Sequence, residues 1–131
     1  MGLRLVVEVE GEDVRSGEGL SGRAWIINTG SDPVDMRTLR TVFGGVALPG
    51  GDRLLGQFRG WQTTVGPSRV RIAAGAAHEL HLLVGTDAGW AEPLRRGTYQ
   101  VLAHAEVLVD GPPQRHVELR AVGPQLELID S

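Results

Sequence analysis

The stretch GTYQVLAHAEVLV, from Gly97 to Val109, decides the fold. Six apolar residues occupy every second position from Tyr99 to Val109. A period of two is the spacing at which the side chains of a strand reach the same face of a sheet. The stretch therefore predicts a long strand with one face in the core.

A second strand is expected to return along the first. Asp110–Pro113 is rich in turn residues, and His116–Val122 alternates again, with Val117 and Leu119 at inward positions. This order predicts an antiparallel hairpin. Gln125–Ile129 is expected to add a last strand at the edge of the sheet.

The same alternation, interrupted by Gly, Pro, Asn and Asp, runs through the rest of the chain. Strands are expected over Leu3–Val9, Leu20–Thr29, Val34–Phe43, Ser68–Ala73 and His78–Val84. A further hairpin is expected where Val46–Leu48 and Arg53–Leu55 flank Pro49–Asp52. The sum is about eight or nine short strands with no substantial helix. It predicts an all-β, immunoglobulin-like antiparallel β-sandwich that forms a single domain over residues 1–131.

Composition argues against several partners and chemistries. The net charge of −3 is spread along the chain, which argues against binding to nucleic acid, and no apolar run is long enough for membrane insertion. The chain has no cysteine, so disulfides and thiolate chemistry are excluded, and we expect it in the cytoplasm. All 13 cations are arginines, and a lysine-free chain has no Walker A loop and no Schiff base.

Catalytic motifs are missing as well. His78 and His81 lie three residues apart in an expected strand, where they point to opposite faces and do not share a metal. The serines lie in turn or strand-edge contexts, without the Gly-x-Ser-x-Gly elbow. We therefore expect no catalytic residue, no metal site and no cofactor.

Three resemblances to known folds and families accompany this pattern. Leu94–Tyr99, followed by the long strand, resembles the tyrosine corner of immunoglobulin-like sandwiches. Gly17–Ala24, Asn28–Gly30, Ala73–Gly75 and Val122–Pro124 are similar to the layout of arrestin-like domains, including bacterial sporulation-control proteins, which implies a non-enzymatic scaffold. Trp90, Glu92–Leu94 and Gly97–Tyr99 also resemble the C-terminal half of the intracellular proteinase-inhibitor family.

Four residues are candidates for binding. Phe58, Arg59 and Trp61 lie within four positions in a Gly-flanked stretch, and Trp and Arg are enriched at interface hot spots. The alternative is that Phe58 and Trp61 close one end of the core while Arg59 pairs with a carboxylate. Trp90 has the same two interpretations, as a core plug or as a contact surface.

Three functions remain open at this point. The first is a non-catalytic cytoplasmic protein-binding or scaffold module. Such a module could also self-associate through an edge strand, either Leu3–Glu10 or Gln125–Ile129. The second is a proteinase inhibitor that presents a loop at Gly56–Thr64. The third is a carbohydrate-binding module that stacks a glycan on Trp61 and Trp90.

Overall fold

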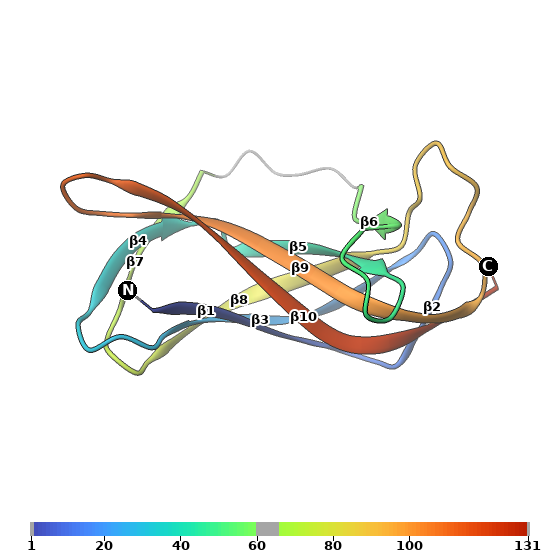
Figure 1. Cartoon of the computed structure of the whole chain (residues 1–131), viewed down its shortest axis with the longest axis horizontal. Coiled ribbons are helices and arrows are strands. Elements are labelled where there is room, and N and C mark those ends of the chain that lie inside the picture. The colour runs from blue at the N-terminus through green and yellow to red at the C-terminus, as the bar shows by residue number, and fades with distance from the viewer. Residues whose placement is uncertain (1, 60–65, 131) are drawn as a thin grey trace.

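A computed structural model describes residues 2–59 and 66–130, and the elements in those ranges are all strands (Figure 1). They are β1 (Leu3–Val9), β2 (Asp13–Arg15), β3 (Gly19–Asn28), β4 (Val34–Thr38), β5 (Thr41–Ala47), β6 (Gly56–Gln57), β7 (Ser68–Ile72), β8 (Ala77–Gly85), β9 (Gly97–Val109) and β10 (Arg115–Ile129). The expected all-β class is confirmed, with ten strands in the described part of the chain where eight or nine were expected.

The strands form one curled sheet, in which seven follow the order β1-β3-β8-β5-β9-β10-β2. Off this path, β4 pairs with β7 and β9, and β6 pairs with β5. β1 and β10 are not neighbours in this order but contact each other across the core. The Gly123 backbone of β10 approaches the side chains of Val7 in β1 and Val101 in β9. The N-terminal segment changes sides, since β1 pairs with β3 and β2 pairs with β10. Curling folds the sheet over its own apolar face, which gives an immunoglobulin-like β-sandwich.

Most strand pairs are antiparallel, but two are parallel. β5 runs parallel to β8, and the C-terminal end of β10 runs parallel to β2. Parallel neighbours need a long connection, and both pairs join segments far apart in the chain. The antiparallel expectation therefore holds for the other strand pairs of the described residues and not for these two.

β9 has the bounds that the sequence predicts, and its inward residues from Tyr99 to Val109 are all buried. The Tyr99 hydroxyl donates a hydrogen bond to the Arg95 carbonyl at 2.7 Å. This contact confirms the predicted tyrosine corner.

The expected edge strand at Gln125–Ile129 is wrong. These residues continue β10 past a bulge between Val122 and Gln125, and they lie between β9 and β2. The sequence suggests a turn at Gly123, but the glycine instead lets the bulged strand pass close to the core. Within the described residues, β1 pairs on one side only, as expected for an end of the strand order.

The single strand expected over Val34–Phe43 is two strands. β4 pairs with β7 and with the end of β9, whereas β5 enters between β8 and β9. The expected hairpin after β5 is present, with β6 as its second strand. The two strands approach closely at Gly45, where a Cβ would overlap the Gly56 carbonyl, so only glycine fits there.

One buried polar side chain fixes the end of the sandwich where β3 stops. The Asn28 amide donates to the carbonyls of Asp32 at 2.7 Å and Ile72 at 3.0 Å. Its oxygen accepts a hydrogen bond from the Gly30 N–H at 3.0 Å. Because every polar atom of this side chain has a partner, its burial is compatible with a stable core.

Candidate functional site

The outward face of β5, β9 and β10 carries a hollow with a volume of about 800 Å³. We call it the outer groove. Its floor is formed by outward residues of the three strands, including Phe43, Leu102 and Val122. One wall is formed by the segment after β5, which includes Leu54 and Phe58.

One half of the outer groove is apolar. The rings of Phe43 and Phe58 are stacked, with centroids 5.1 Å apart and an interplanar angle of 24°. Val122 is 71% exposed and Leu54 is 44% exposed. Outward strand positions of an antiparallel sheet usually carry polar residues, so this apolar gathering on the solvent side is a candidate contact surface.

The other half of the outer groove is charged. Glu106 and Glu118 are direct cross-strand partners, as are His104 and Arg120. The Arg120 Nε donates to the Glu118 Oε1 at 2.9 Å. This hydrogen bond and the positive charge of Arg120 hold the pKa of Glu118 below its usual value. Glu106 has no ion pair within the described part of the chain.

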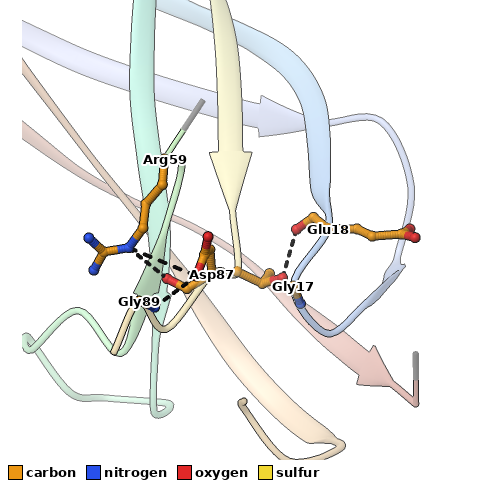
Figure 2. A network of polar contacts seen from close by, with 6 residues as sticks. Gly17, Glu18, Arg59, Asp87 and Gly89 are labelled. Carbon is orange, nitrogen blue, oxygen red and sulfur yellow. Dashed lines mark hydrogen bonds and ion pairs between the residues drawn. The ribbon is translucent and has the colours of Figure 1, made fainter. Parts of the chain in front are cut away.

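Phe58 and Arg59, two of the four predicted site residues, lie on different parts of the surface. Phe58 lines the outer groove, where it is half-buried against Phe43. Arg59 instead lies on Gly89, and its Nε is 3.3 Å from the Asp87 carbonyl and 4.0 Å from the Asp87 carboxylate (Figure 2). Arg59 therefore pairs with a carboxylate, as one of its two predicted interpretations required.

The two tryptophans have different outcomes. Trp90 is fully exposed, at 106%, so the core-plug interpretation is wrong for this residue. Its loop follows the turn in which the Gly89 N–H donates to the Asp87 carboxylate at 2.7 Å. Trp61 lies outside the described residues. The structure therefore does not bring the four predicted residues together into one described site.

The segment proposed as an inhibitor loop is packed where it is described. Gly56–Arg59 crosses the end of β8 at Gly85. The approach is so close that a Cβ on Gly85 would overlap the backbone at Gln57 and Phe58. It also pairs with β5 and with Asp87. This part of the segment does not project from the sandwich.

The polar groups beneath Asp87 connect neighbouring loops. The buried Thr86 hydroxyl donates to the Glu18 carbonyl at 2.6 Å and accepts from the Gly17 N–H at 2.9 Å (Figure 2). Ser16 donates to the Leu94 carbonyl at 2.7 Å in the same region. Their hydrogen bonds therefore hold the turn between β2 and β3 against the loop after β8.

The described ranges contain neither a candidate metal site nor a candidate membrane-spanning helix. Within residues 2–59 and 66–130, no group of three or more His, Asp or Glu side chains is placed to hold a metal ion. No helix in those ranges is long and apolar enough to cross a membrane.

Sequence reasoning missed the outer groove. Phe43, Leu102, Glu106 and Val122 are not among the four predicted site residues, although the sequence contains one signal. Leu102 occupies an outward position of β9, between the polar residues Gln100 and His104. An apolar residue in the polar half of an alternating strand is a mark of a covered outer face.

Comparisons with known proteins locate similar folds. No family model and no curated protein matches the sequence. Among solved structures, the chain is similar to the sporulation control protein Spo0M from Bacillus subtilis, with a TM-score of 0.42 and 14% identity over 94% of this chain and 50% of that one. It is also similar to the ASH/PapD-like domain 7 of human CEP192, with a TM-score of 0.34 and 15% identity over 95% of this chain and 86% of that domain.

The chain thus spans about half the length of the Spo0M chain that it matches. The sandwich part of the predicted resemblance is supported by the structure itself, in which a curled all-β sheet carries the tyrosine corner. The proteinase-inhibitor part stays a prediction. The chain is a β-sandwich of immunoglobulin-like type.

Proposed function

We propose that the chain is a non-catalytic protein-interaction module that binds an extended segment of a partner protein in the outer groove. The observation that carries the proposal is the stacked pair of Phe43 and Phe58 beside Leu102 and Val122, on a sheet face directed to solvent. The absence of cysteine supports a cytoplasmic setting.

The dimensions of the outer groove suit a polypeptide segment. Its volume of about 800 Å³ accommodates several side chains, and it follows the strands from Leu102 toward Glu106. An extended segment has the same two-residue side-chain period as the strands below it. Alternate side chains of the partner would therefore meet successive outward positions of β9 and β10.

The test compares capture from the lysate of the source organism by the wild-type chain and two variants. Val122→Arg places a long cation on the apolar floor, while Trp90→Ala removes a fully exposed large apolar side chain outside the outer groove and serves as the matched control. Both positions are exposed, so circular dichroism should show an unchanged fold. We expect a protein captured by the wild type and by Trp90→Ala to be lost on Val122→Arg.

The opposite pattern identifies a different surface. If Val122→Arg captures the same proteins as the wild type, the outer groove is not the interface. Light scattering of the purified chain provides a second control, because a dimer abolished by Val122→Arg would mean that the occupant is a second copy of the chain. That result would replace the partner protein with self-association.

Carbohydrate binding is the second candidate, and the full exposure of Trp90 favours it. An exposed indole offers an apolar face with a polar tip, which suits a sugar ring. A change in tryptophan fluorescence on addition of glycans should then be absent in Trp90→Phe. A flat response in the wild type would remove this candidate.

A further inference from the structure

The charges that line the outer groove are unequal in sign. Asp52, Glu106 and Glu118 contribute three carboxylates and Arg120 contributes one guanidinium, so the lining carries a net charge of −2 with His104 neutral. An acidic lining attracts cations and repels an acidic segment.

The two glutamates place two like charges at one cross-strand position of the sheet. Glu106 and Glu118 face each other across β9 and β10, and like charges in direct cross-strand positions destabilise a sheet. Arg120 neutralises only Glu118, because its Nε contacts that carboxylate. A cation above the pair would supply the counter-charge that Glu106 lacks among the described residues.

The register fixes how far this acidic pair lies from the apolar half. Phe43 is the cross-strand partner of His104, and Glu106 follows two residues later in β9. At about 3.3 Å per residue, the acidic pair is about 7 Å from Phe43 along the strand and about 13 Å from Leu102. In an extended segment, residues two and four positions apart have the same separations and point to the same side.

We infer that the occupant of the outer groove carries an arginine or lysine two or four positions from a large apolar residue. The apolar side chain would rest on Phe43, Phe58 and Leu102, and the cation would lie over Glu106 and Glu118. This inference rests on the proposed function, because it names the chemistry of the segment that the outer groove binds.

The test selects peptides from a displayed library of random sequences against the immobilised full chain. In the wild-type selection, Arg and Lys should be enriched two or four positions from an apolar residue. Selected peptides are then synthesised and their affinities measured for the wild type and for Glu106→Lys/Glu118→Lys. Reversing two exposed charges should weaken binding by at least about tenfold at low salt, and the difference should shrink as salt rises.

A matched pair of substitutions controls for net charge. Glu8→Lys/Glu10→Lys makes the same change at two exposed carboxylates near the end of β1, outside the lining of the outer groove. Its affinities should stay within about twofold of the wild type at matched salt. A selection against Glu106→Lys/Glu118→Lys should in turn enrich Asp and Glu at the same spacing.

The results distinguish a failure of the charge preference from a failure of the proposed function. If Val122→Arg abolishes binding of the selected peptides but they show no excess of Arg or Lys, the charge inference is wrong and the proposed function stands. If no selected peptide loses binding on Val122→Arg, the proposed function fails and the inference fails with it.

Discussion

The two faces of β9 differ in what they do, although they share one backbone. Its inward residues Val101, Ala103, Ala105, Val107 and Val109 are no more than 8% exposed and form part of one core. On the outward face, Leu102 is half-buried while His104 and Glu106 are exposed. The inward face is uniform because packing allows only apolar side chains there, whereas the outward face mixes chemistries that packing does not require.

The same contrast separates the polar groups of the two faces. Asn28 is buried on the inward side, and all its polar atoms have partners within the chain. Glu106 is exposed on the outward side and has no ion pair among the described residues. A side chain that folding requires has its partners inside the molecule, and an outward charge without one is free to meet a partner outside it.

Adjacent residues of β9 give the largest expected difference between the faces. Val101→Asp buries an unpaired carboxylate and should cost at least about 4 kcal/mol in the free energy of unfolding, which leaves little folded protein. Leu102→Asp should cost less than about 1 kcal/mol because its side chain faces the outer groove. Urea denaturation followed by circular dichroism measures both, and equal losses would contradict the assignment of the faces.

Asn28 tests whether a polar group of the inward face is structural. Asn28→Ala removes three hydrogen bonds and leaves the buried Ile72 carbonyl without this partner, so we expect a loss of about 2–4 kcal/mol. Thr29→Ala, at the exposed neighbouring position, is the control and should change stability by less than about 0.5 kcal/mol. Denaturation curves that coincide for the two variants would show that the Asn28 contacts do not hold the turn.

Tyr99→Phe is a smaller perturbation of the same inward face. It keeps the ring in the core and removes only the hydrogen bond to the Arg95 carbonyl, so the expected loss is about 1 kcal/mol. Thermal unfolding should show a lower midpoint with unchanged cooperativity. An unchanged midpoint would mean that the tyrosine corner contributes packing alone.

The smallest effect is expected on the outward face, at Glu118. Its pKa is lowered by Arg120, so the contact stabilises the folded chain above the ordinary glutamate pKa of about 4.3 and is lost as the pH falls through the lower folded value. An NMR titration should find that Arg120→Gln raises the pKa of Glu118. If the pKa does not move, the ion pair does not persist in solution.

Alternation predicts most of the inward face from the sequence, because burial imposes a period of two on the side chains. It predicts the bounds of β9 and the inward positions of β1, and the residues before Tyr99 predict the corner. The division of Val34–Phe43 into β4 and β5 is not predictable in this way. It depends on which distant strands lie beside each half, and local alternation carries no information about that.

The outer groove could not be predicted from the sequence for a related reason. Phe43, Leu102 and Val122 come from three strands, and only the register brings them together. Phe58 was recognised as unusual, but its contact with Phe43 depends on Gly45 and Gly85, which let the segment pass close to the sheet. Arg59 and Trp90 are predicted as binding residues from their residue type alone, and residue type does not specify the face on which a side chain lies.

The most direct test of the central claim is to map the bound peptide on the chain. Two-dimensional NMR spectra of the isotope-labelled chain, recorded while a peptide from the display selection is added, report on each backbone amide. If the peptide binds in the outer groove, the largest shifts should fall at Phe43, Leu102, Glu106 and Val122, with small shifts around Asp87 and Trp90. Shifts confined to the Arg59, Asp87 and Trp90 loops, with the outer groove unchanged, would contradict it.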